Sequence, residues 1–189
     1  MWRGPLLLGA LVLAGCVTLT SAQQEKLDDW RAFADRVTAH YKTSRVTFLV
    51  GAHGGFEAAS MRPGGLMTVT PEALDPGKRT DFMLAHELAH WVLGHLDGRT
   101  YPSTLERRRA AQAKEMEANA EAVPILVLGR GGSERDAFVQ AQAYLWGWKS
   151  LVERGGTGIP EGHAEPCEEI ADLIRRFPQH ATVSRPCPA

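Results

Sequence analysis

The sequence predicts a single α+β domain that is mostly helical and contains one small sheet. The chain has 189 residues, a length that favours one domain. Hydrophobic residues make up 44% of the chain, which is enough apolar material to bury a core. Long segments with apolar residues at helical spacing accompany only two short runs of β-branched and apolar residues. The domain is expected to cover residues 25–189.

Residues 1–22 are expected to form an export leader and the start of a tether. Arg3 provides a positive charge before an apolar run at 6–14, and that run is too short to span a bilayer as a helix. The run ends in Leu13-Ala14-Gly15-Cys16, which resembles the bacterial lipobox, so Cys16 is the expected lipidation site. Cleavage after Thr20-Ser21-Ala22 is the alternative and would release a soluble periplasmic or secreted protein. Both alternatives predict export, and the lipid would be the only membrane anchor, on the periplasm-facing side.

One helix and two strands are expected before the stretch that carries the chemistry. Apolar residues recur at helical spacing over 27–41, after a polar tether at 17–26. The runs at 46–50 and 66–70 are rich in β-branched and apolar residues and predict strands, the second at a sheet edge. Glycine-rich turns are expected between them.

The stretch 80–96 is predicted to be a helix that holds a metal ion, with Thr80 or the following aspartate as its cap. It contains His86-Glu87-Leu88-Ala89-His90, an H-E-x-x-H pattern. Side chains at positions i and i+4 lie on one face of a helix, so His86 and His90 can bind a single ion. Glu87 lies beside the first ligand, where it can act as general base on a water at the metal. This arrangement is typical of zinc hydrolases.

Catalytic zinc has three protein ligands and one open position, so a third ligand is needed. A histidine in the pattern H-E-x-x-H-x-x-G-x-x-H would stand at position 96, where the chain has Leu96. His95 is one residue off that register, which is about 100° around a helix, so it is expected to point away from the metal. The other histidines outside the motifs are also expected to be surface or packing residues: His40, His53 and His180.

A glutamate on a later helix is the better candidate for the third ligand. Glu115 and Asn119 stand at i and i+4, and therefore on one face of that helix. Glu115 is predicted to bind the metal, while Asn119 behind it accepts the outer N–H of a ligand histidine. Glu117 and Glu121 lie on a different face and are expected to be solvated.

Three helices are expected in the second half of the chain. They are predicted over 105–128, after Ser133, and from Pro166 to about residue 177. Pro124 should kink or interrupt the first of them. Apolar residues at helical spacing over 138–152 predict that one stripe of the second helix packs on the core.

One disulfide is expected near the C-terminus. Cys167 and Cys187 are the two cysteines that follow the leader, and in an oxidising compartment they pair most simply with each other. The bond would tie the C-terminal tail to the last helix and contribute about 3 kcal/mol. Two free thiols in a reducing compartment are the alternative, and the leader argues against it.

The motifs resemble those of the gluzincin metallopeptidases. His86-Glu87-Leu88-Ala89-His90 followed by Glu115-x-x-Ala118-Asn119 is similar to the H-E-x-x-H and E-x-x-A-D segments of the CAAX prenyl endopeptidase/HtpX-type family. Residues 163–170 are similar to that family's H-P-x-x-x-E-R-I segment, whose histidine faces the active site. The resemblance implies a zincin-like metallopeptidase domain with one zinc ion, held by His86, His90 and Glu115. It also implies that Glu87 is the general base and that His163 helps to stabilise the transition state.

Three positions depart from the family's pattern and bear on how the site is held. Asn119 stands in place of the usual aspartate, Ala164 in place of a proline and Glu169 in place of an arginine. The resemblance further implies that the strand at 66–70 pairs with an extended substrate through backbone hydrogen bonds. The chain would be a small exported form without the transmembrane helices of the prenyl endopeptidases.

Two functions from different classes follow from these patterns. The first is a zinc-dependent endopeptidase of the bacterial cell envelope that acts on a protein or peptide substrate. The second is a catalytically inactive envelope lipoprotein that keeps the fold for binding or assembly. Glu87 favours the enzyme, because a binding protein has no need of a general base, whereas the three departures favour the second function. With 21 Lys+Arg against 22 Asp+Glu the charge is nearly balanced, so no nucleic acid is expected as a partner.

Overall fold

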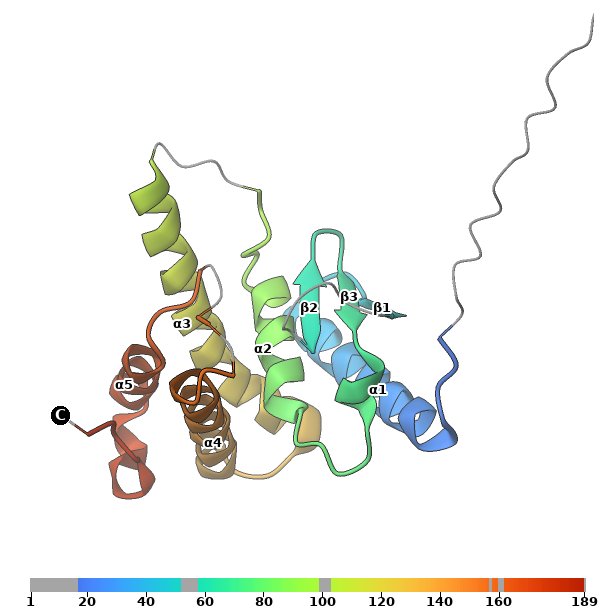
Figure 1. Cartoon of the computed structure of the whole chain (residues 1–189). Coiled ribbons are helices and arrows are strands. Elements are labelled where there is room, and N and C mark those ends of the chain that lie inside the picture. The colour runs from blue at the N-terminus through green and yellow to red at the C-terminus, as the bar shows by residue number, and fades with distance from the viewer. Residues whose placement is uncertain (1–16, 52–57, 99–102, 157, 160–161, 189) are drawn as a thin grey trace, which may run out of the picture.

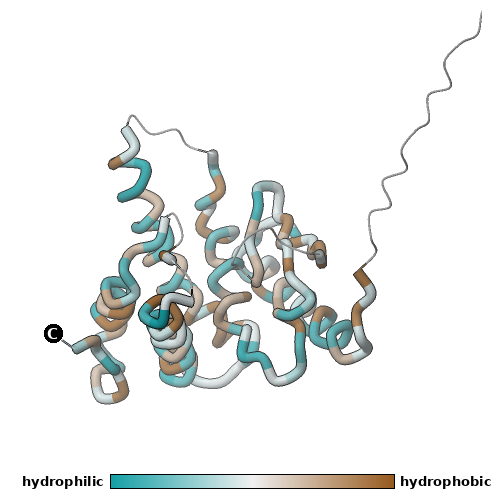
Figure 2. The backbone as a smooth tube through the Cα atoms, in the orientation of Figure 1, coloured by the Kyte–Doolittle hydropathy of each residue, from teal (hydrophilic) through white to brown (hydrophobic). Residues whose placement is uncertain are grey.

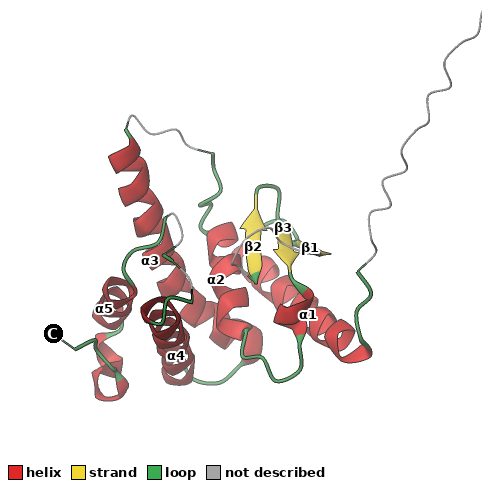
Figure 3. Cartoon of the chain, viewed as in Figure 1, coloured by secondary structure: helices red, strands yellow, loops and turns green. Residues whose placement is uncertain are grey.

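Helices and one three-stranded sheet form the part of the chain that the computed structural model describes, residues 17–51, 58–98, 103–156, 158–159 and 162–188 (Figure 1). The helices are α1 (Ser21–Tyr41), α2 (Asp81–Val92), α3 (Thr104–Arg130), α4 (Glu134–Glu153) and α5 (Pro166–Arg176). The strands are β1 (Thr47–Val50), β2 (Ala59–Arg62) and β3 (Leu66–Val69), and two short 3-10 segments are η1 (Pro71–Leu74) and η2 (Pro178–Val183). Helix predominates over the small sheet, which confirms the α+β class (Figure 3).

Some of the sequence predictions lie outside the described residues. Cys16, the expected lipidation site, is one of these, together with the apolar run before it. His53 is another. In the part of the chain that is described, no helix has both the length and the apolar character needed to cross a membrane.

α1 begins at Ser21, inside the segment that was expected to be a polar tether. Thr20 Oγ1 accepts a hydrogen bond from the Gln23 N–H (3.2 Å), and Gln23 Oε1 accepts one from the Thr20 N–H (2.9 Å). The Gln23 side-chain nitrogen also donates to Asp75 Oδ1 at 2.9 Å. The tether prediction is therefore wrong for residues 21–26, because their polar side chains cap and anchor a helix.

β3 is the central strand of the sheet, and β2 is the strand beside α2. The strand order is β1-β3-β2, with β1 parallel and β2 antiparallel to β3. A strand does form at 66–69, but the prediction that it lies at a sheet edge is wrong. Met67 and Val69 of β3 are fully buried, as expected for a strand with a neighbour on each side. β2 was missed because it has only four residues, too few for an apolar–polar alternation that predicts a strand. Ala59 and Met61 are its two buried residues.

α2 occupies the middle of the molecule, between the sheet and the helices α3, α4 and α5 (Figure 1). Its Leu84 and Leu88 are fully buried in a core to which α1 contributes Trp30 and Phe33. The first turns of α3 extend beyond this core and are largely hydrophilic (Figure 2). The chemical groups of α2 are thus carried by a helix that has packed neighbours on several sides.

α3 is one continuous helix, and it carries Glu115 and Asn119 of the predicted metal site. Ser103 caps it, because its Oγ accepts the Glu106 N–H at 3.2 Å. Pro124 lies inside the helix without interrupting it, flanked by the fully buried Val123 and Ile125. The packing of these neighbours holds the turn in helical form despite the missing N–H of proline.

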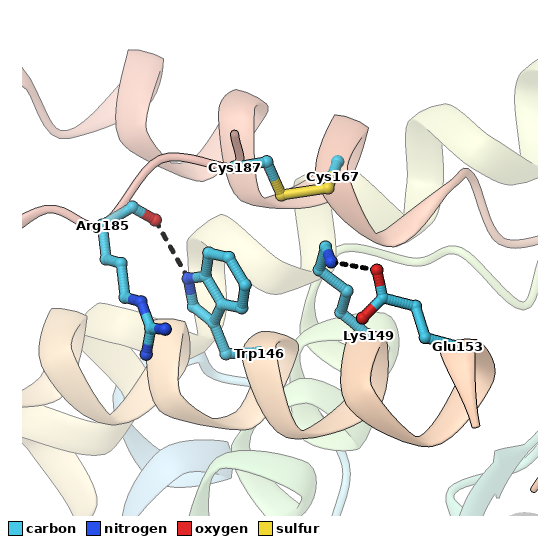
Figure 4. The surroundings of a disulfide bond; sticks show 6 residues. All are labelled: Trp146, Lys149, Glu153, Cys167, Arg185 and Cys187. Carbon is cyan, nitrogen blue, oxygen red and sulfur yellow. Dashed lines mark hydrogen bonds and ion pairs between the residues drawn. A yellow bond between two sulfur atoms is a disulfide. The ribbon is translucent and has the colours of Figure 1, made fainter. Parts of the chain in front are cut away.

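The predicted disulfide joins Cys167 of α5 to Cys187 of the C-terminal tail, with 5.7 Å between their Cα atoms. Beside it, the Trp146 indole N–H donates to the Arg185 carbonyl oxygen at 2.9 Å, and the Arg185 guanidinium lies 4.3 Å from the centre of the Trp146 ring (Figure 4). Trp146 belongs to α4, so the tail is held to two helices. A disulfide is typical of proteins that fold in an oxidising compartment.

Candidate metal centre

Two histidines of α2 and one glutamate of α3 converge on a single point. His86 Nε2 lies 3.1 Å from His90 Nε2 and 3.1 Å from Glu115 Oε2, and His90 Nε2 lies 3.4 Å from the same oxygen. A tetrahedral zinc ion with ligands at about 2.0–2.1 Å holds its ligand atoms about 3.3 Å apart. The three predicted ligands therefore stand at separations that one such ion requires, and they could hold a metal ion.

Burial and mutual charge explain why these three groups stay together. Burial raises the pKa of Glu115, but hydrogen bonds from His86 and His90 outweigh it and hold that pKa below its usual range. Burial lowers the pKa of His86, but its hydrogen bond and charge interaction with Glu115 bring that pKa to about 9. Burial also lowers the pKa of His90 and outweighs Glu115 there. Glu115 is thus an ionised carboxylate at neutral pH, the form that binds a metal.

Asn119 connects a ligand histidine to a buried carboxylate. His86 Nδ1 donates to Asn119 Oδ1 at 2.9 Å, which directs the lone pair of His86 Nε2 toward the metal point. Asn119 Nδ2 donates in turn to Glu169 Oε2 at 3.1 Å. Asn119 and Glu169 are each only 2% exposed. Two of the three departures from the family's pattern therefore contact each other: an amide and a carboxylate occupy the positions where the family has an aspartate and an arginine.

Glu169 also positions the histidine that was predicted to face the site. Its Oε1 lies 3.2 Å from His163 Nδ1 and, being a carboxylate oxygen, accepts the proton of that nitrogen. His163 Nε2 lies 3.6 Å from Glu115 Oε2, and its ring is stacked with that of His86 at 6.5 Å and 18°. Burial lowers the pKa of His163, but its hydrogen bond to Glu169 and the charge of Glu115 outweigh burial and raise that pKa. His163 is therefore biased toward the protonated form, a donor at the edge of the site.

His95 contacts the outer nitrogen of the other ligand, which the sequence analysis did not foresee. His95 Nδ1 lies 3.1 Å from His90 Nδ1, and His95 Nε2 lies 3.2 Å from Glu117 Oε2. The Glu117 carboxylate accepts the His95 Nε2–H, so His95 Nδ1 accepts the His90 Nδ1–H. Both ligand histidines thus present Nε2 to the metal point. The prediction that His95 is only a surface or packing residue is therefore wrong, whereas the Glu117 side chain is 55% exposed, as predicted.

The reason for that error is the end of α2. The 100° rotation per residue applies only within a helix, and α2 ends at Val92. Gly94 then adopts a left-handed backbone conformation, with φ at 70°, and returns the chain so that His95 reaches His90. Glycine is a common residue just past the C-terminus of a helix, so Gly94, inside the stretch predicted to be helical, was the available sign that the helix ends before His95.

Glu87, the predicted general base, is held by the neighbouring strand. Its Oε2 accepts the Met61 N–H of β2 at 2.6 Å. The Thr70 N–H donates to the Ala58 carbonyl oxygen, so the register turns the backbone groups of residues 58, 60 and 62 toward β3. Ala59 and Met61 consequently direct theirs away from β3, and both line the cavity at the metal point.

A cavity of about 550 Å³ connects these groups. Its floor is formed by the three metal-ligand residues, with Glu87 and Asn119 beside them. One side is the edge of β2 at which no strand of the described residues pairs, and the other is formed by α4 and by His163. All the residues predicted for the metal and for catalysis therefore line one cavity, to which five segments of the chain contribute.

Comparisons with other proteins do not place the chain in a family. No family model, no curated protein and no solved structure matches it. The gluzincin resemblance and the zincin-like fold thus stay predictions from the motifs.

Proposed function

We propose that the protein is a zinc-dependent endopeptidase. The observation that carries the proposal is the convergence of His86, His90 and Glu115 at tetrahedral separations, with Glu87 in the same cavity. Two imidazoles and one carboxylate form a ligand set found in catalytic zinc sites, which keep one position open. Closed structural sites usually have four protein ligands, most of them cysteine.

The donors of this site suit zinc better than a hard cation. Calcium and magnesium prefer oxygen ligands alone, whereas imidazole suits zinc and other transition metals. His86, His90 and Glu115 would hold the ion. A bound zinc ion supplies Lewis acidity and lowers the pKa of a coordinated water to about 7.

Glu87 is the group that moves the proton. It accepts a proton from the attacking water and then delivers it to the amine that leaves. The Met61 N–H donates to Glu87 Oε2 and so orients the carboxylate that takes part in this exchange. Because that bond comes from the strand edge, the position of the base is tied to the strand beside which a substrate would lie.

The free edge of β2 is the surface on which an extended substrate would pair. Ala59 offers both its backbone groups there, and Met61 offers its carbonyl oxygen. Pairing of this kind gives affinity that depends little on side chains. Backbone pairing with the substrate was expected at the strand 66–70. It is proposed instead for 59–62, because β3 has a strand on each side.

His163 is proposed to stabilise the charge that develops on the carbonyl oxygen of the substrate. Glu169 accepts the His163 Nδ1–H, so Nε2 faces the cavity. The raised pKa of His163, to which Glu169 and Glu115 contribute against burial, favours a protonated ring that can donate from Nε2.

The enzyme is proposed to work outside the cytoplasm, as a lipoprotein at Cys16 or as a soluble exported form. The Cys167–Cys187 disulfide supports an oxidising compartment. An inactive lipoprotein with the same fold is the second candidate, and the departures at 119, 164 and 169 favour it. The hydrogen bond between Asn119 and Glu169 weighs against that candidate, because it keeps the ligand His86 oriented.

The test compares the wild-type chain with Glu87→Gln, Glu115→Ala and the exposed control Glu72→Gln. Zinc per chain is measured, and a mixture of unrelated peptides is searched for new termini by mass spectrometry. Wild type, Glu87→Gln and Glu72→Gln should hold one zinc, and only Glu115→Ala should lose it. Cleavage by Glu87→Gln should fall at least about 100-fold, in line with general base catalysis. Equal cleavage by wild type and Glu87→Gln would refute the mechanism, and zinc binding without any cleavage would favour the inactive lipoprotein.

A further inference from the structure

α4 has two apolar faces, and only one of them packs on the core. Phe138, Ala141 and Leu145 are buried, as the predicted stripe requires. A second row at i, i+3, i+4 and i+7 is not covered in the same way: Tyr144, Gly147, Trp148 and Leu151. Tyr144 is 38% exposed and Leu151 is 41% exposed. We call this second row the α4 wall.

The α4 wall faces the candidate metal site. All four of its residues line the cavity that contains the metal ligands and Glu87. The Trp148 ring lies 6.0 Å from that of His163. Met83 and Leu96 line the same cavity and add further apolar surface. A partly exposed apolar surface beside a candidate catalytic group is suited to a ligand that carries an apolar side chain.

The charges around the cavity point to the same kind of ligand. Glu87, Glu115 and Glu169 line it, whereas no lysine or arginine of the described chain does. An acidic side chain would meet these carboxylates without a lysine or arginine to pair with. A large apolar side chain would instead be removed from water against the α4 wall.

We propose that the substrate is an extended polypeptide that places a large apolar side chain against the α4 wall, next to the bond that is cut. This inference rests on the proposed endopeptidase function and adds a substrate class to it. The backbone of the substrate lies along the free edge of β2, and the side chain crosses the cavity toward α4. Gly147 sets how large that side chain can be.

Gly147 offers a direct test of the size limit. A Cβ placed on Gly147 meets no atom within 4 Å, and the residue has no left-handed backbone conformation. A side chain at 147 would therefore occupy open space at the cavity without straining α4. Glycine is also unfavourable inside a helix relative to other residues, so Gly147→Leu is expected to fold at least as well as the wild type.

The experiment uses acetyl-amino-acid hydroxamates, which combine a zinc-binding group with one side chain. Binding of the alanine, leucine, phenylalanine and glutamate compounds to the zinc-loaded chain is measured by calorimetry. Leucine and phenylalanine should bind at least about 10-fold more tightly than alanine, the scale on which apolar pockets discriminate added methylenes. Glutamate should bind no more tightly than alanine.

Gly147→Leu should reduce the leucine and phenylalanine preference to less than threefold while zinc affinity is unchanged. Val139→Leu is the matched control, because Val139 is an exposed α4 residue that does not line the cavity. Equal affinity for all four compounds in the wild type, or an unchanged preference in Gly147→Leu, would overturn the inference. If a second copy of the chain covers the α4 wall, Gly147→Leu will instead change the sedimentation of the protein, and no preference will be seen. A chain that binds no zinc fails the proposed function itself, so the two failures are distinguishable.

Discussion

Exchange of the two polar groups behind the metal site tests whether Asn119 and Glu169 act as a unit. Asn119→Asp places a carboxylate oxygen where the amide nitrogen now lies 3.1 Å from Glu169 Oε2. Glu169→Gln creates the opposite mismatch, because the single oxygen of the new amide cannot accept from both Asn119 Nδ2 and His163 Nδ1. The double variant exchanges the two groups. The new carboxylate at position 119 would accept from both His86 and the new amide at position 169, and the oxygen of that amide would still accept from His163.

The size of each effect follows from these contacts. Two unit charges about 4 Å apart repel by about 4 kcal/mol at an effective dielectric constant of about 20. Uptake of a proton relieves part of this repulsion, so Asn119→Asp should lower the free energy of unfolding by about 2–4 kcal/mol. Glu169→Gln leaves a buried donor without an acceptor, which costs about 1–3 kcal/mol. The double variant satisfies every donor and should lose about 1 kcal/mol or less.

Urea unfolding of the metal-free chain at pH 7, followed by circular dichroism, measures the free energy of unfolding of the wild type, the two single variants and the double variant. The structure predicts a coupling of at least about 2 kcal/mol in favour of the double variant, well above the error of additivity. Glu168→Gln is the control, since Glu168 is the exposed neighbour of Glu169. Additive losses within about 0.5 kcal/mol would refute the inferred contact.

Two further predictions concern the metal ligands themselves. His95→Ala removes the acceptor of the His90 Nδ1–H and should weaken zinc binding about 10–100-fold. His40→Ala, at an exposed histidine, is the control and should leave zinc affinity unchanged. Equal zinc affinities of the two variants in a chelator competition would contradict the role of His95. The His86 pKa, which burial lowers but Glu115 raises to about 9, means that zinc binding at pH 7.5 should release about one proton and should tighten as the pH rises toward 9. Calorimetry in two buffers of different ionisation heat measures that release. The same raised pKa stabilises the metal-free fold fully below the ordinary value of 6.5, and this contribution is lost as the pH rises through about 9, so the urea midpoint should fall over that window.

Helical spacing alone predicted the parts of the site that lie within one helix. His86 and His90 share a face of α2 because their positions are set by the 3.6-residue repeat, and the same holds for Glu115 and Asn119 on α3. The helical repeat does not predict which carboxylate of another helix contacts Asn119. Glu169 comes from α5, fifty residues downstream, and only the packing of α5 on α3 joins them.

Long-range contacts also decide the strand order of the sheet and which apolar row of α4 is buried, and neither could be predicted from the sequence. Strand order depends on long-range pairing, so the short β2 and the central place of β3 could not be derived from the local pattern. The apolar stripe of α4 was predicted as core, but a sequence does not show which apolar row a neighbour covers. The row that stays uncovered is the one that faces the cavity, and it is there that substrate selection is proposed.

The central claim is that the H-E-x-x-H helix and Glu115 together hold one zinc ion in an open site. X-ray absorption at the zinc edge of the zinc-loaded chain tests it most directly. The predicted spectrum has four nitrogen or oxygen ligands at about 2.0–2.2 Å with the scattering pattern of two imidazoles, and Glu115→Ala removes the metal. A sulfur ligand at about 2.3 Å, a single imidazole, or retention of zinc by Glu115→Ala would contradict it.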